Sequence, residues 1–159
     1  MGANISGYSI LPSEKEFISK WLGAFGENKA KVAVVDLKQG WGSMVPGNGG
    51  LLGEGLKVKG RSFAWGLAGH ACSEIKLLSN RALKRLRGSV GIEWNSVTSA
   101  QKAATSAVFS VSAGGKTLWT SEALRFDSDA QAFDLALNGE SELLLRADSA
   151  TPLTFGHIA

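Results

Sequence analysis

The sequence predicts an all-β domain of antiparallel strands, built as a sandwich or a barrel, with one short helix before it. Short runs of alternating apolar and polar residues recur along most of the chain, as strands require. A ratio of 20 glycines to 3 prolines supplies the tight turns between such strands. With 159 residues, of which 44% are hydrophobic and 19% charged, the chain suits one globular domain that buries its own core.

The helix is expected near the N-terminus, where Ser13 and Glu16 form a capping-box pattern. In this pattern the hydroxyl and the carboxylate accept hydrogen bonds from free backbone N–H groups. A stripe of apolar residues follows at helical spacing and ends before Gly26. The stripe consists of Phe17, Ile18, Trp21, Leu22 and Phe25. Because such a stripe is typical of a packing face, we interpret residues 1–29 as an extension whose helix docks on the domain of residues 30–159 or on a neighbouring domain.

The next part of the chain predicts strands around a long glycine-rich loop. Residues 31–36 are β-branched and apolar, whereas residues 40–55 have the composition of a loop. Residues 56–59 alternate between aliphatic residues and lysine, which is the pattern of a half-buried strand. Residues 74–78 and 83–94 are the next expected strand segments.

The second half of the chain predicts a β-hairpin and two further strands. Phe109 and Val111 alternate with serine, and the paired glycines of residues 113–116 lead into a second apolar run at 117–120. Paired glycines supply the positive φ angles of a primed hairpin turn. Residues 133–148 then hold two strands around an Asn-Gly turn.

The composition excludes or disfavours several classes of protein. One cysteine, Cys72, excludes a framework of internal disulfides. No apolar run approaches the length of a membrane span, and the first residues lack the pattern of a signal peptide. A net charge of +3 gives little support for a nucleic-acid partner. Lys84, Arg85 and Arg87 form the densest basic cluster, which we interpret as a solvent-facing part of a strand.

The residues that catalysis needs are scarce. His70, His157 and Cys72 do not have the number or spacing of a zinc site. His70 and Cys72 would share one face of a strand, but no third group orients them as a base and a nucleophile. The glycines of residues 47–53 are not followed by the helix that a phosphate cradle requires. We therefore expect a protein that is not an enzyme.

The tryptophans carry the clearest functional signal. Four of them lie in or beside expected loops and strand ends: Trp41, Trp65, Trp94 and Trp119. A sugar stacks its apolar C–H face on indole, and its hydroxyls need carboxylate, amide or imidazole partners. Trp41 stands between two glycines, which suits an exposed platform, although a core position is the alternative for every indole. Two indoles with His70 and Glu93 would form a sugar site if their loops converge.

Residues 63–75 (FAWGLAGHACSEI) resemble the (F/Y)xxGigxHAxSxI core of the NPCBM domain, also classed as carbohydrate-binding module family 51. Shorter segments resemble the flanking motifs of that family in the same order. They are residues 40–42, 56–60, 90–93, 108–111, 115–118, 120–121, 143–148 and 156–159. Each segment alone is weak, and the specificity comes from their common order over residues 32–159.

The resemblance implies a β-sandwich of jelly-roll type that is appended to glycoside hydrolases or other extracellular enzymes and binds galactose-containing glycans. It also implies a secreted or cell-surface location. The chain departs from the family pattern at Glu93, where the family has Asp, and at Gly156, where the family has Asp before the final His. Because sugar binding is not assured for each member, a structural or protein-interaction module that has lost the site is the main alternative.

We interpret the domain as a lectin-like, non-catalytic module that binds galactosides. The residues expected to bind the sugar are Trp41, Arg61, Trp65, His70, Glu93 and Trp94. The indoles would stack on the sugar, and the polar side chains would bind its hydroxyls. For His70, a buried imidazole with a structural role is the alternative. An enzyme fragment and a nucleic-acid-binding strand are the remaining alternatives for the chain.

No cofactor is expected, and the expected partners are carbohydrate and a parent glycoside hydrolase or other modules, without nucleic acid or membrane. A structural calcium ion is left open because many sandwich modules use one. Its candidate oxygen donors are Asp36, Asp127, Asp129 and Asp148.

Overall fold

The structure is a computed structural model that describes residues 32–40, 45–47, 55–64, 66–93, 105–150 and 157–158; at 45–47 and 157–158 only the strand is described. Among these residues all helical or extended elements are β-strands, with no helix, and every strand pair is antiparallel. The all-β, antiparallel prediction is therefore confirmed. The predicted N-terminal helix lies outside the described residues. No helix in the described part is long and apolar enough to cross a membrane.

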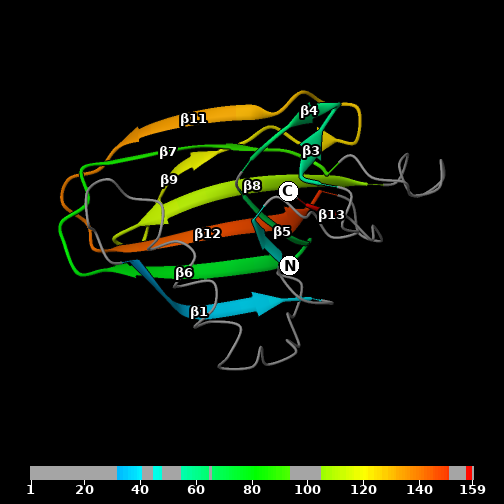
Figure 1. Cartoon of the computed structure of the whole chain (residues 1–159). Coiled ribbons are helices and arrows are strands. Elements are labelled where there is room, and N and C mark those ends of the chain that lie inside the picture. The colour runs from blue at the N-terminus through cyan, green and yellow to red at the C-terminus, as the bar shows by residue number, and fades with distance from the viewer. Residues whose placement is uncertain are drawn as a thin grey trace.

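The strands follow one another along the chain as Figure 1 labels them. Their bounds are β1 Val32–Gln39, β2 Val45–Gly47, β3 Lys57–Val58, β4 Arg61–Ser62, β5 Gly66–His70, β6 Ser73–Ser79, β7 Arg85–Val90, β8 Ser106–Ala113, β9 Lys116–Thr120, β10 Leu124–Arg125, β11 Gln131–Ala136, β12 Glu142–Ser149 and β13 His157–Ile158.

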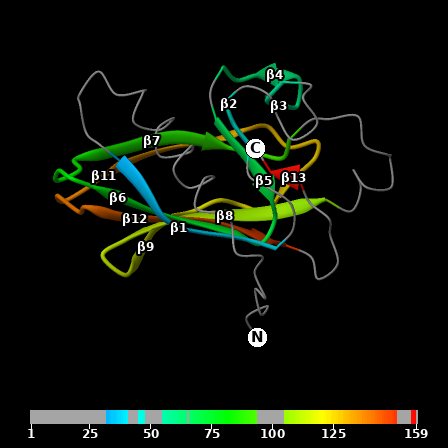
Figure 2. The same ribbon diagram turned by 60° about the horizontal axis from the view of Figure 1, so that its bottom comes forward.

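The largest sheet has the strand order β1-β6-β12-β8-β10, and β9 joins it beside β8. The smaller sheets are β11-β7, β13-β5-β2 and β3-β4. Figure 2 shows β7 and β11 in one layer and β6, β12, β8 and β9 in another, with β5 between the layers at one end. Trp119 of β9 and Phe133 of β11 join the layers, with ring centroids 5.0 Å apart. Two layers agree with a sandwich, whereas the jelly-roll order of connections stays a prediction.

The predicted hairpin is confirmed as the pair β8 and β9. Gly114 and Gly115 have φ angles of 55° and 75°, and Ala113 pairs with Lys116 across the turn. A side chain is strained at two successive positive φ angles, so this turn needs its glycines. The predicted Asn-Gly turn also contains a positive φ, 93° at Gly139, and there the chain passes from β11 to β12.

Several strand bounds differ from the prediction, among them β7, which occupies only Arg85–Val90 of the expected 83–94. Two differences in the first half are explained by strand pairing. β1 continues to Gln39 instead of ending at Asp36, because Leu37 packs in the core and Lys38 binds Glu74 of β6. Residues 45–47, predicted within a loop, form β2 because they pair with the edge of β5. Both differences arise from pairing between segments distant in sequence, which a local sequence pattern does not reveal.

Alternation along the strands builds the core on the inner face of the large sheet. Every second residue of β6 is buried, including Ile75 and Leu77, and the residues between them are half-buried or exposed. One apolar cluster contains Val34, Leu37, Ile75, Leu77, Ala113, Leu137 and Leu143. A second contains Ile92, Ala107, Phe109, Leu124 and Ala147. Burial of these side chains is the dominant stabilising contribution in a chain without a disulfide.

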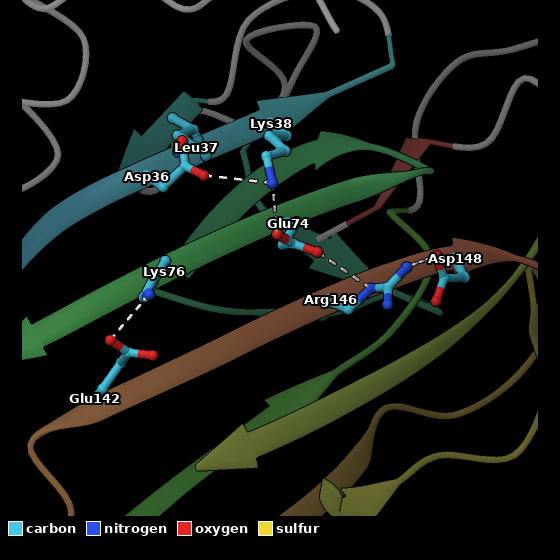
Figure 3. A network of polar contacts seen from close by, with 8 residues as sticks. All are labelled: Asp36, Leu37, Lys38, Glu74, Lys76, Glu142, Arg146 and Asp148. Atoms are coloured by element: carbon cyan, nitrogen blue, oxygen red, sulfur yellow. Dashed lines mark hydrogen bonds and ion pairs between the residues drawn. The ribbon is translucent and has the colours of Figure 1, made fainter. Parts of the chain in front are cut away.

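The outer face of the same sheet is polar and carries a chain of ion pairs, drawn in Figure 3. Lys38 lies 3.1 Å from Glu74, Glu74 lies 3.5 Å from Arg146, and Arg146 lies 3.2 Å from Asp148. The hydrogen bond and the charge of Glu74 raise the pKa of Lys38 above its ordinary value. The charges alternate in sign across β1, β6 and β12, which keeps this face soluble and favours the observed register.

The basic cluster lies on the solvent face of β7, as predicted. Arg85 and Arg87 are both exposed, with half-buried Leu86 between them. Arg85 forms a two-bond pair with Asp134 of β11, and its Nε lies 2.6 Å from one carboxylate oxygen. The pair joins the two strands of this small sheet at their solvent face.

Candidate functional site

The end of β1 and the corner between β5 and β6 meet at one end of the domain. Gly40 follows β1, and its N–H donates a hydrogen bond of 3.0 Å to the carbonyl oxygen of Cys72 in that corner. Gln39 lies opposite Ser73 in the register of β1 and β6. Gln39 and Ser73 are both buried, so the inner face of the sheet becomes polar at this end.

His70 is the last residue of β5 and lies inside this end of the domain. His70 is 7% exposed, and its backbone N–H donates a hydrogen bond of 3.4 Å to the side-chain oxygen of Gln39. β5 is flanked by β2 and β13, and His70 is opposite His157 in the register. This burial is what the structural interpretation of His70 requires, whereas direct sugar contact stays a prediction.

Glu93 lies at the same end, after β7, and is 1% exposed. Ala71 follows His70 in the chain, Ile92 precedes Glu93, and both belong to the apolar packing around Phe109. The fold therefore brings Ala71 and Ile92, the chain neighbours of His70 and Glu93, into one apolar cluster. A carboxylate so deeply buried is unfavourable unless neighbouring groups satisfy it, which makes Glu93 a determinant of local geometry.

Among the described members of the predicted set, which are Arg61, His70 and Glu93, Arg61 is exposed. It lies on β4, and its guanidinium carbon is 5.0 Å from the centre of the Phe63 ring. The tight turn before it has positive φ angles at Lys59 and Gly60, and Lys59 pairs with Asp129 at 3.2 Å. Stacking on the ring holds the guanidinium at the surface, where its N–H groups face solvent and can donate to a ligand.

The predicted stacking platforms Trp41, Trp65 and Trp94 lie outside the described residues. Their positions stay predictions. The fourth indole that the sequence singled out, Trp119, packs against Phe133 between the layers. Its role is in the core, which is the alternative that was open for every tryptophan.

A cavity of about 370 Å³ lies between the two layers, next to this end of the domain. Its lining is mainly aliphatic and aromatic, and includes Phe109, Trp119 and Phe133. None of Arg61, His70 and Glu93 lines it. Since a sugar needs partners for its hydroxyls, this cavity is a feature of the core and a poor carbohydrate site.

In the described part of the chain, no three His, Cys, Asp or Glu side chains gather as metal ligands. Three of the four candidate calcium ligands form ion pairs within the protein. Asp36 lies 3.4 Å from Lys38, Asp129 pairs with Lys59, and Asp148 pairs with Arg146. These three carboxylates therefore balance cations of the protein.

Gln39 is the residue of this site that sequence reasoning missed. Its side chain is among the largest that are fully buried, at 1% exposure. One signal was present in the sequence: alternation from Leu37 places Gln39 on the inward face, directly before the Gly-Trp-Gly motif. An inward glutamine at the end of an apolar strand indicates a polar contact inside the domain.

Comparisons with known proteins identify the family and agree with the fold. The family model of the NPCBM/NEW2 domain matches residues 29–155. The chain belongs to this family. The match confirms the resemblance drawn from residues 63–75 and their flanks. No curated protein sequence matches the chain.

Solved structures similar to this NPCBM domain are modules of the CBM51 type. The CBM51 of a Clostridium perfringens GH95 protein, in complex with methyl-galactose, has 16% identity and a TM-score of 0.61, with 79% of this chain and 94% of that chain covered. The CBM51-2 and INT domains of Clostridium perfringens ZmpB, in complex with GlcNAc, have 17% identity and a TM-score of 0.64, with 79% and 29% covered. The tandem CBM51 modules of a family 98 glycoside hydrolase from Streptococcus pneumoniae have 19% identity and a TM-score of 0.66, with 98% and 50% covered.

These likenesses establish a shared fold. This NPCBM domain spans less than a third of the ZmpB chain and half of the tandem modules, so it corresponds to one module of larger proteins. NPCBM domains are non-catalytic binding modules, and this chain is likewise not an enzyme.

Proposed function

We propose that this NPCBM domain binds carbohydrate as an accessory module of a larger glycan-active protein, and that its ligands are galactose-containing glycans. Membership of the family supports carbohydrate binding. Galactose is supported by the methyl-galactose complex of one similar module, while the GlcNAc complex of another makes that sugar the principal competitor.

The proposed site is the end of the domain formed by β4, the corner between β5 and β6, and the segment after β7. One observation carries the carbohydrate function, the family match over residues 29–155. The place of the site is supported by the exposed Arg61, whose guanidinium stacks on Phe63 at the start of the motif of residues 63–75. Arg61 supplies exposed donors for hydroxyls, and Trp41, Trp65 and Trp94 are the proposed platforms. Buried polar residues below would hold the shape of a shallow site above them.

The proposed module comprises residues 30–159, and residues 1–29 are an extension before it. We place the parent protein outside the cell or on its surface, because the similar modules belong to glycan-active bacterial proteins. A shallow site for one sugar gives a Kd of about 10 µM to 1 mM, or about −4 to −7 kcal/mol. Linked copies or a linked enzyme would then raise the avidity.

The test is a glycan array that includes galactose, lactose, blood-group oligosaccharides and GlcNAc. Selective galactoside signals are expected from the wild type, and Trp41→Ala should lower the affinity by about tenfold or more, as the loss of a central indole does. Arg61→Met should weaken the same signals. Lys59→Met is the matched control, because Lys59 is an exposed cation on the same hairpin and pairs with Asp129.

A second function, a structural or protein-interaction module, is favoured by the burial of His70 and Glu93. Under that function the polar residues serve only the fold. A folded wild type that gives a blank array would contradict sugar binding and support this alternative. Signals for GlcNAc alone would keep the carbohydrate function and remove the galactoside.

A further inference from the structure

Gln39 is a polar side chain at a position that packing alone would give to an apolar one. It ends β1 on the inward face, two residues after buried Leu37, and only 1% of it is exposed. An amide in such a place is unfavourable unless its groups are hydrogen-bonded. Its presence there therefore indicates a contact that only a polar group can make.

That contact joins two different sheets. The side-chain oxygen of Gln39 accepts the backbone N–H of His70 at 3.4 Å. β1 is the edge strand of the large sheet, whereas β5, which carries His70, pairs with β2 and β13. The amide thus connects the end of one sheet to the strand of another at the point where His70 is placed.

A second bond holds the same strand end. The N–H of Gly40 donates to the carbonyl oxygen of Cys72 at 3.0 Å, on the other side of the corner that follows His70. A Cβ at Gly40 would lie 3.4 Å from the carbonyl oxygen of Ala71, so the two backbones are already in contact there. Trp41, the first proposed sugar platform, follows Gly40 directly in the sequence.

We infer that Gln39 is a positioning residue of the sugar site. Its amide fixes the strand of His70 against the end of β1, and it thereby sets the position of His70 relative to Gly40, the residue before Trp41 in the sequence. The inference rests on the proposed carbohydrate function and adds a residue to it. Gln39 itself is buried and acts through its neighbours.

The test compares Gln39→Met with Gln39→Glu. Methionine keeps the length of the side chain and removes the acceptor. Glutamate keeps an acceptor oxygen, and the measurement is made at mildly acidic pH because burial favours the neutral form of its carboxyl. Gln39→Met should lower the affinity for the best array ligand by about tenfold, and Gln39→Glu should restore most of it. Hydrogen exchange at the His70 amide should quicken in Gln39→Met and stay slower in Gln39→Glu.

Leu143→Ala is the stability control, because Leu143 is buried in the apolar cluster and lies four positions along β12 from Ala147, the partner of Ser73. It should destabilise the domain at least as much as Gln39→Met and leave the affinity unchanged. Unchanged affinity in folded Gln39→Met would overturn the inference, as would an equal loss in Leu143→Ala. A wild type that binds no glycan would remove the proposed function first and this inference with it.

Discussion

Two neighbouring residue pairs on the inner face of β1 and β6 show how the apolar core differs from the polar end of the domain near His70. Leu37 lies opposite Ile75, and one step along the strands Gln39 lies opposite Ser73. All four are buried. The first pair belongs to the apolar cluster, whereas the second stands beside the corner that carries His70.

The two pairs have different roles: the apolar pair stabilises the fold, and the polar pair places one backbone relative to another. Apolar burial is non-directional, so the Leu37 pair contributes free energy and tolerates small shifts of its neighbours. A hydrogen bond depends on distance and angle, so the Gln39 contact contributes little net stability and fixes where two backbones stand. We therefore expect substitutions in the apolar part to change unfolding and substitutions in the polar end to change binding.

The largest expected effect on stability is that of Leu37→Ala. Removing a buried leucine from a packed cluster lowers the free energy of unfolding by about 2–5 kcal/mol. Leu118→Ala is the matched control, since Leu118 is 38% exposed and should change stability by less than about 0.5 kcal/mol. Urea unfolding measures both, and glycan affinity of the folded Leu37→Ala protein should equal that of the wild type. Lost affinity in a folded Leu37→Ala protein would contradict the separation.

Glu93→Ala should lower glycan affinity strongly and stability less than Leu37→Ala does. Groups that the buried carboxylate satisfies would be left without it, which lowers the free energy of unfolding by about 1–3 kcal/mol. Glycan affinity should fall by more than tenfold, because the surface above Glu93 would change shape. Glu122→Ala, at an exposed glutamate, is the control for removal of a carboxylate. Lower stability with full affinity would show that Glu93 serves the fold alone and would strengthen the interaction-module alternative.

The hairpin and the alternating strands were predictable because their signals are local. Gly114 and Gly115 dictate a turn between two short apolar runs, and the structure has that turn. The pairing of β12 between β6 and β8 was not predictable, since partner and register follow from contacts distant in sequence. The first strand was predicted too short because its β-branched apolar run ends at Asp36, whereas the pairing of β1 with β6 continues to Gln39.

Of the candidate site, both the chemistry of sugar recognition and the resemblance to the family pointed to His70 and Glu93. Sequence could not show that Glu93 is almost fully buried or that Ala71 and Ile92 pack in one cluster, because burial arises from both layers together. Gln39 was missed for the same reason, although its alternation with Leu37 pointed inward. Arg61 stays a predicted site residue, and its stacking on Phe63 could not be predicted because it depends on a hairpin of two short strands.

The smallest expected effect extends the comparison to the outer surface of β7 and β11. The hydrogen bond from Arg85 lowers the pKa of Asp134 below its ordinary value, and the charges of Arg85 and Arg87 act in the same direction. A carboxyl whose pKa is lower in the folded state stabilises that state above its unfolded pKa, near pH 4, and loses the contribution as pH falls through the folded pKa.

Asp134→Asn should therefore lower the urea midpoint slightly at pH 7, and the difference from the wild type should shrink as the pH falls below about 4. Arg85→Met should reproduce this dependence on pH because it removes the other partner of the same pair. Asp127→Asn, at an exposed aspartate of the turn before β11, is the control and should not reproduce it. Added salt should reduce the effect at pH 7, since the pair faces solvent. If the difference in urea midpoint stays constant down to pH 3, the asparagine acts through packing and not through the loss of charge. The pair of Arg85 and Asp134 would then, like the Gln39 contact, serve mainly to hold two strands in place.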